Sequence, residues 1–229
     1  MKTIGLIGGM SWESTVTYYQ VINRVVKEKL GGFCSAKCLL YSVNFDEIEK
    51  CQMSGDWQKS GKILNQAALS LKKGGADFIV LCTNTMHKVA DQIMQNVDLP
   101  FLHIAEATAN RLKAHGICKT ALFGTKFTMQ QDFYKSVLIK NGIDVIIPND
   151  DDVSLINDVI YNQLCMGEIK QESKKEFLRI IDDMQKQGAE SVILGCTEIG
   201  LLVQQQDTTV KLFDTALIHA EQAALLAIE

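Results

Sequence analysis

Two short polar clusters contain the residues of this sequence that are best suited to chemistry. The first is CTNTMH at residues 82–87, and the second is GCTE at residues 195–198. Each follows an apolar run that predicts a strand and precedes a segment that predicts a helix, so its N–H groups and hydroxyls can bind a carboxylate. A cysteine there lies near the positive end of a helix, which lowers its pKa. We therefore expect Cys196 to be reactive rather than a buried apolar residue.

The predicted strands and helices must position these clusters. Short apolar runs alternate along the chain with segments in which apolar residues recur at helical spacing, a pattern typical of an α/β fold with parallel strands. Predicted strands cover residues 3–7, 38–43, 78–82, 101–103, 120–123, 144–147 and 191–194. Predicted helices cover residues 12–29, 60–73, 106–114, 129–141, 153–164, 173–187 and 215–228. Because the strands are continuously apolar, we expect helices on both faces of the sheet.

An internal repeat relates the two clusters. Residues 74–83 and 188–197 each contain Gly-Ala and an acidic residue, then a strand that ends in Cys-Thr. Residues 4–8 and 121–124 are strands that end in glycine, each followed by a Ser or Thr that can cap a helix. The alternative is that α/β strands resemble one another by chance. We expect two pseudo-symmetric lobes with doubly wound parallel sheets, residues 1–100 with 215–229 and residues 101–214, and a ligand cleft between them.

Composition narrows the class of protein. The chain has 229 residues, is 47% apolar and carries a net charge of −4 without a basic run, which argues against nucleic-acid binding. No apolar stretch approaches a membrane span, and the N-terminal run breaks too early for a signal peptide. Seven cysteines fit no zinc pattern, and four scattered histidines make a metal site improbable. We expect a cytoplasmic protein without a metal.

Five motifs in order resemble the aspartate/glutamate racemase family, which works without pyridoxal phosphate, over nearly the whole chain. They are GGMS at 8–11, NTMH at 84–87, GT at 124–125, GCTEI at 195–199 and FDT at 213–215. The stretches MSWES at 10–14 and CTNTMH at 82–87 are most similar to the broad-specificity amino-acid racemases of enteric bacteria. The resemblance implies a cofactor-independent racemase in which one acid/base group from each lobe acts on opposite faces of the substrate Cα, and a homodimer.

Cys196 is the acid/base residue that the resemblance assigns to the second lobe. The developing charge on the substrate carboxylate needs preorganised donors, which Asn84, Thr85 and Thr197 can supply. The substrate-binding residues we expect are Met10, Gln52, Asn84, Thr85, Thr125 and Thr197. Glu198 either pairs with a helix N-terminus or holds the substrate ammonium.

The first motif departs from the family pattern, in which a cysteine directly precedes Asn-Thr. Here Thr83 precedes Asn84, and Cys82 lies one position earlier. Alignment on the Asn-Thr pair puts Thr83 at the catalytic position, whereas alignment on the internal repeat puts Cys82 there. Successive strand residues point to opposite faces, so only one can serve, and we favour Thr83. Its hydroxyl is a poor base, which predicts a slow enzyme in both directions.

The second departure concerns substrate specificity. Family members that are selective for acidic amino acids carry an Arg after the second strand and a Lys in a later helix. Residues 44–52 of this sequence contain no Arg, and Cys165 occupies the Lys position. Unless Lys50 substitutes, the pocket favours neutral polar substrates such as homoserine. The alternatives are an aspartate/glutamate-specific racemase, a related isomerase or decarboxylase, and an amino-acid-binding protein that has lost one base.

Overall fold

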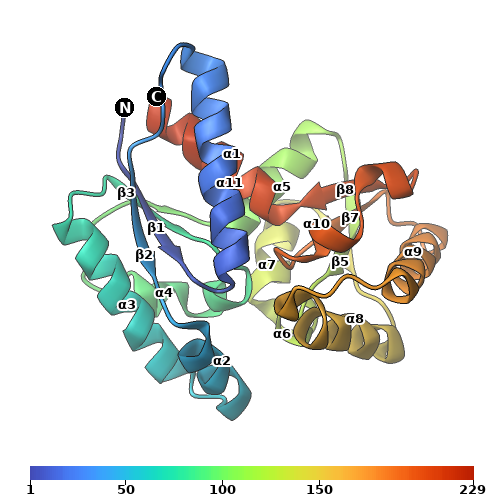
Figure 1. The fold of residues 1–229 in the computed structure, drawn as a ribbon. Helices are drawn as coiled ribbons and strands as arrows, with labels where there is room; N and C mark the ends of the chain where they lie inside the picture. Colours follow the sequence, from blue (N-terminus) through green and yellow to red (C-terminus); the bar gives the residue numbers. More distant parts are fainter. The chain divides into compact units, whose positions relative to one another are not determined.

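The computed structural model describes all of residues 1–229 and divides into two compact units. Unit 1 comprises Met1–Ile104 with His219–Glu229, and unit 2 comprises Ala105–Ile218. Each unit contains one four-stranded parallel sheet with flanking helices (Figure 1). The prediction of an α/β fold built from two similar lobes is confirmed, because the strands form two separate sheets rather than one continuous sheet.

The sheet of unit 1 has the strand order β2-β1-β3-β4. Its strands are β1 (Ile4–Gly8), β2 (Cys38–Ser42), β3 (Phe78–Leu81) and β4 (Phe101–Leu102). The helices and 3₁₀ turn of this part of the chain are α1 (Trp12–Leu30), α2 (Phe45–Ser54), α3 (Trp57–Lys73), η1 (Thr85–Val89) and α4 (Ala90–Ile93). The carboxyl ends of β1 and β3 are neighbours, so the segments that follow them lie at the same edge of the sheet.

Both faces of this sheet are covered. On one face, apolar residues of α3 pack against Ile7, Ile79 and Leu81 in a continuous core. On the other face lie α1 and the C-terminal helix α11 (Thr215–Ile228). The Tyr18 hydroxyl of α1 donates to Nδ1 of His219 in α11 (2.9 Å), and Nε2 of His219 donates to the Leu102 carbonyl (2.8 Å). The end of the chain is therefore fastened to β4 and α1.

The sheet of unit 2 has the order β6-β5-β7-β8. Its strands are β5 (Lys119–Phe123), β6 (Asp144–Ile146), β7 (Ser191–Leu194) and β8 (Lys211–Asp214). Its helices and 3₁₀ turns are α5 (Ile104–Ala114), α6 (Lys126–Gln130), α7 (Asp132–Lys140), α8 (Asp150–Asn162), η2 (Leu164–Met166), α9 (Gln171–Lys186), α10 (Ile199–Leu202) and η3 (Gln205–Asp207). Buried residues of α8 and α9 form the core on one face of this sheet.

The internal repeat is visible in the strand orders. Within its own sheet, β5 occupies the place that β1 occupies in the other, and β7 corresponds to β3. The predicted caps are also present, because the Ser11 hydroxyl accepts from the N–H of Ser14 at α1 and the Thr125 hydroxyl accepts from the N–H of Thr128 at α6. The repeat in the sequence therefore corresponds to a repeat in topology.

The main differences from the sequence prediction lie in three parts of the chain. The prediction missed β8, a short edge strand whose only apolar side chains are Leu212 and Phe213. It also missed α2, which is rich in charged residues and buries only Ile48, Cys51 and Gln52. The single helix predicted over residues 129–141 is two helices, α6 and α7, which divide at Gln131. In each case the apolar signal is too short for periodicity to define the element.

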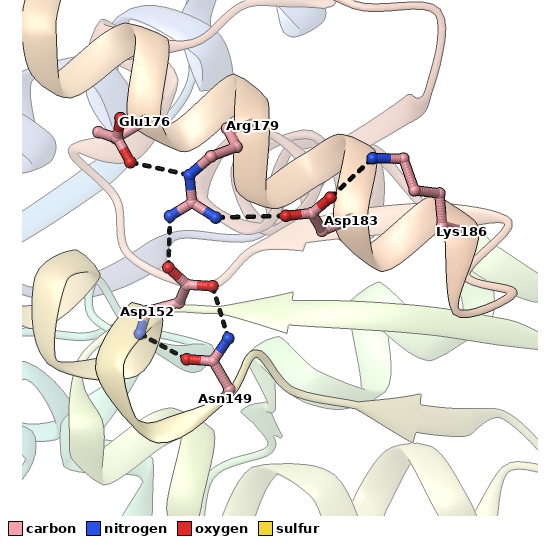
Figure 2. A network of polar contacts seen from close by, with 6 residues as sticks. All are labelled: Asn149, Asp152, Glu176, Arg179, Asp183 and Lys186. Atoms are coloured by element: carbon pink, nitrogen blue, oxygen red, sulfur yellow. Dashed lines mark hydrogen bonds and ion pairs between the residues drawn. The ribbon is translucent and has the colours of Figure 1, made fainter.

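A polar network joins the two helices that cover one face of unit 2 (Figure 2). The Arg179 guanidinium in α9 donates to the carboxylates of Asp152, Glu176 and Asp183, and Lys186 also pairs with Asp183. Asp152 is nearly buried in the first turn of α8, so its contact with Arg179 links the two helices.

The N-cap of α8 belongs to the same network. The Asn149 side-chain oxygen accepts from the N–H of Asp152 (2.9 Å), and its amide donates to the Asp152 carboxylate (2.9 Å). This double contact fixes the start of α8.

None of the helices combines the length and the apolar character that crossing a membrane requires. The structure contains no group of three or more His, Cys, Asp and Glu side chains arranged to hold a metal ion. All seven cysteines are free thiols.

Candidate active site

The structure places the candidate residues in two sets, one at the carboxyl edge of each sheet. In unit 1, Met10 follows β1, Thr83, Asn84 and Thr85 follow β3, and Gln52 lies on α2. All five side chains are buried. The Gln52 amide donates to the Met86 sulfur (3.1 Å), which ties α2 to the turn after β3. We call these five residues the first half-site.

Cys82 and Thr83, the two candidates for the catalytic position of unit 1, differ in how far they are buried. The Cys82 side chain is 0% exposed, whereas that of Thr83 is 9% exposed. Burial, with a smaller contribution from Cys38, holds the pKa of the Cys82 thiol far above its ordinary value. A thiol so enclosed can neither reach a substrate nor ionise readily. Thr83 is therefore the better candidate of the two for contact with a substrate.

His87 holds the first half-site in shape. Its Nε2 accepts from the N–H of Ile104 (3.2 Å), so the ring proton is on Nδ1, which donates to the Thr83 carbonyl (2.8 Å). Burial, together with His103 and His219, keeps the pKa of His87 well below its ordinary value. His87 is thus a neutral ring that holds the Thr83 backbone in position.

The second half-site lies in unit 2 and consists of Thr125 after β5 with Cys196, Thr197 and Glu198 after β7. The Cys196 thiol donates to Oε2 of Glu198 (3.0 Å), and the Thr197 hydroxyl donates to the same oxygen (2.8 Å). Cys196 and Glu198 are both buried. A thiol, a hydroxyl and a carboxylate thus share one short turn.

The electrostatic surroundings of Cys196 correct the expectation of a favoured thiolate. The pKa of its thiol is raised well above the ordinary value, chiefly by burial and then by the negative charge of Glu198, with Cys165 adding to the effect. The helix that follows, α10, has only four residues, so its dipole is small. Cys196 is therefore a protonated thiol that donates a hydrogen bond to the Glu198 carboxylate.

Two glycines bring the ends of β5 and β7 together beneath Cys196. The N–H of Gly195 donates to the Phe123 carbonyl (2.6 Å), and a Cβ at Gly195 would lie 2.6 Å from that oxygen. A Cβ at Gly124 would lie 2.9 Å from the Gly195 carbonyl oxygen. Neither position accepts a side chain without movement of the backbone, so the glycines fix the register of the Cys196 turn.

Of the residues considered for specificity, Gln52 and Cys165 have neutral side chains and Lys50 has an exposed one. Lys50 lies on α2, is exposed, and pairs with Asp46 one turn earlier (2.7 Å). Cys165, in η2, packs against the core that contains Cys196. The buried amide of Gln52 is the polar side chain that α2 contributes to the first half-site.

Within each half-site the candidate residues lie in the segments that follow the strands, and α2 contributes Gln52. Neither of the two roles considered for Glu198 from the sequence includes the hydrogen bonds that it accepts from Cys196 and Thr197. Its position two residues after Cys196, in a turn after a strand, is the signal that indicates such a contact.

Comparison with known proteins identifies this arrangement. The profile of the Asp/Glu/Hydantoin racemase family matches residues 7–223. The broad specificity amino-acid racemase RacX of Bacillus subtilis is 26% identical over 95% of both chains. A candidate Asp/Glu racemase from Yersinia pestis has a crystal structure that is 53% identical, with a TM-score of 0.93 over 100% of both chains. An aspartate racemase homologue from Pyrococcus horikoshii is 37% identical, with a TM-score of 0.86 over 100% of both chains.

The family match and the named relatives show that this protein is an amino-acid racemase, an enzyme of the isomerase class. The chain belongs to the Asp/Glu/Hydantoin racemase family.

Proposed function

We propose that this enzyme is a cofactor-independent racemase of broad specificity that uses two acid/base groups, Cys196 and Thr83. The observation that carries the proposal is the Cys196 thiol, buried after β7 and hydrogen-bonded to Glu198. The predicted lobes, residues 1–100 with 215–229 and residues 101–214, act as the two domains, and each carries one of the two half-sites.

The reaction transfers one proton from Cα and returns one to the opposite face. One group takes the Cα proton, the electron pair delocalises into the substrate carboxylate, and the other group delivers its proton to Cα. Donors preorganised at that carboxylate lower the barrier, and the supporting residues are Asn84, Thr85 and Thr197. Met10, Gln52 and Thr125 complete the substrate-binding set.

Cys196 can deliver a proton directly, because its thiol is protonated. To accept one, it must first pass its proton to the Glu198 carboxylate, which already accepts its hydrogen bond. Thr83 offers only a hydroxyl, which must release its own proton to water when it takes the Cα proton, so proton transfer at that side is expected to limit the rate in both directions.

The proposed substrates are neutral polar amino acids such as homoserine. A distal carboxylate is best held by Arg or Lys. Lys50 is exposed and paired with Asp46, and the α2 residue in the half-site is the neutral Gln52. Losing one charge-assisted contact costs about 1.5–3 kcal/mol, so aspartate and glutamate are expected to be no better than homoserine or methionine.

We also propose that the enzyme is a homodimer in the cytoplasm, the reducing compartment that its seven free thiols suit. The exposed apolar side chains of α1 and β2 support the homodimer.

Deuterium exchange at Cα in heavy water, followed by chiral chromatography, tests the function. We expect homoserine to exchange and to form its mirror isomer, and Cys196→Ala to abolish both while binding persists. Binding without exchange in the wild-type protein would instead support an amino-acid-binding protein. A preference for aspartate above tenfold would contradict the proposed specificity, and activity surviving in Cys196→Ala would contradict the mechanism.

A further inference from the structure

An apolar surface on unit 1 includes none of the first half-site residues and has no role in the chemistry above. A groove of about 440 Å³ is lined by Trp12, Thr15, Val16 and Tyr19 of α1 and by Cys38, Leu40 and Ser42 of β2. The exposed fractions are 64% for Trp12, 44% for Val16, 55% for Tyr19 and 53% for Leu40. Apolar side chains this exposed in one patch mark an interaction surface.

The strand that borders the groove is an unprotected edge. β2 is the outermost strand of its sheet, and its five residues contain neither a charge nor a proline. Soluble proteins usually blunt such edges with charges, prolines or bulges, because an apolar edge pairs with other strands. The edge of β2 therefore fits a partner strand.

The hydrogen-bonding pattern shows which backbone groups the edge presents. Toward β1, the Lys37 carbonyl accepts from Ile4, and the N–H of Val43 donates to Gly8. Because alternate residues of a strand bond to the same neighbour, the backbone groups of Cys38, Leu40 and Ser42 point outward. The same three residues place their side chains along the groove, so the outward backbone and the apolar surface form one continuous face.

That face is complementary to itself under two-fold rotation. If two β2 strands pair antiparallel about Leu40, each Leu40 faces the partner's Leu40, and Cys38 faces the partner's Ser42. All outward residues then form hydrogen-bonded pairs, as an isologous interface requires. Since α1 begins just after β1 and ends before β2, the same rotation brings Trp12 toward the partner's Tyr19, with Val16 near the axis.

The charges that flank the edge also match. Exposed basic residues lie near the start of β2, namely Arg24, Lys27 and Lys37, whereas the exposed Glu47 follows its end, next to an Asp46 that pairs with Lys50. Antiparallel pairing puts the basic end of one copy beside the acidic end of the other. Opposite charges at both ends favour this register over a parallel one.

We propose that a second copy of this chain docks on the α1–β2 face, pairing the two β2 strands antiparallel about Leu40 and joining two four-stranded sheets into one of eight strands. The inference rests on the homodimer proposed above and specifies its interface.

Light scattering after size-exclusion chromatography tests the interface. The wild-type chain, of 25.4 kDa, should run at twice that mass, and Leu40→Lys, which sets two ammonium groups against each other, should run as a monomer. The matched control is Ile139→Lys, on the exposed side of α7 in unit 2, which should stay dimeric. Circular dichroism of each variant establishes that it is folded.

Oxidative cross-linking gives a second test of the interface, which does not require a substitution that disrupts the dimer. With the exposed Cys34 and Cys118 replaced by serine, Leu40→Cys should form a disulfide-linked dimer, since hydrogen-bonded antiparallel pairs have Cα atoms about 5.5 Å apart. Ile139→Cys in the same background should not. A wild-type monomer, or a dimer that Leu40→Lys leaves intact and Leu40→Cys does not cross-link, would overturn the interface. Racemisation is assayed separately, so that failure leaves the proposed activity standing.

Discussion

The Cys196 thiol and the Thr83 hydroxyl differ in acidity, and this difference determines which of the two transfers a proton more easily. A thiol is both easier to ionise and a better proton acceptor than a hydroxyl. Thr83 retains some exposure, whereas Cys82 has none. The residue at position 83 is therefore expected to set the rate, with Cys82 a core residue.

Replacing Thr83 by cysteine should raise kcat/KM for both enantiomers by about one to two orders of magnitude, part of the ~10²–10⁴-fold that a matched acid/base group contributes. Chiral chromatography of initial rates measures the effect. Thr83→Ser is the matched control and should change little, as should Cys82→Ala. Loss of activity in Cys82→Ala, with Thr83→Cys neutral, would show that Cys82 is the partner instead.

Glu198 governs the proton on Cys196. Removing its charge with Glu198→Gln should lower the pKa of the thiol, because the carboxylate is the largest cause of the raised pKa after burial. The pH profile of iodoacetamide alkylation at Cys196, followed by mass spectrometry of its peptide, should shift toward lower pH. Glu190→Gln, an exposed change in the same unit, is the control. An unchanged profile would mean that burial alone raises the pKa.

At the scale of elements, the N-cap of α8 connects local sequence to the packing of unit 2. Asn149 caps α8 and holds Asp152, and Asp152 in turn meets Arg179 of α9 (Figure 2). Asn149→Ala should lower the free energy of unfolding by about 1 kcal/mol, the usual cost of losing a cap. Urea denaturation measures it. Asn149→Ser, which keeps a cap acceptor, should lose clearly less, and equal losses would argue against capping as the cause.

The sequence predicts elements well where their apolar pattern is long. The helix predicted over residues 215–228 coincides with α11, because apolar side chains extend along its full length. The strand β8 is missed because its four residues contain only two apolar ones. The two polar clusters are predictable from their place after strands, whereas the raised pKa of Cys196 depends on burial and on the rotamer of Glu198, which no sequence pattern specifies.

At the scale of the whole molecule, unit 1 depends on residues from both ends of the chain. His219 is fully buried and bonds to α1 and β4. Burial, opposed by the Leu102 hydrogen bond and reinforced by His103, lowers its pKa to about 4. Between pH 6.5 and about pH 4, His219 binds a proton in the unfolded chain but not in the folded one. The free energy of unfolding therefore falls as the pH is lowered through this window.

The free energy of unfolding should therefore drop by about 3 kcal/mol from this residue as the pH falls from 7 to 4, with the buried His87 acting in the same direction. Urea titrations at several pH values measure the drop. His219→Gln should be less stable at pH 7 but less sensitive to acid, whereas His115→Gln, at an exposed position, should keep the wild-type slope. The same slope in His219→Gln would contradict this assignment.

The division of unit 1 between Met1–Ile104 and His219–Glu229 has a consequence for the order of events during synthesis. Unit 2 is continuous in sequence and can close its core as soon as Ile218 has left the ribosome. Most of unit 1 is synthesised first, yet its Tyr18 and Leu102 cannot form their hydrogen bonds to His219 until that residue has been added, after the whole of unit 2. Domains usually mature in the order in which they are translated; in this chain the unit made first is the one completed last.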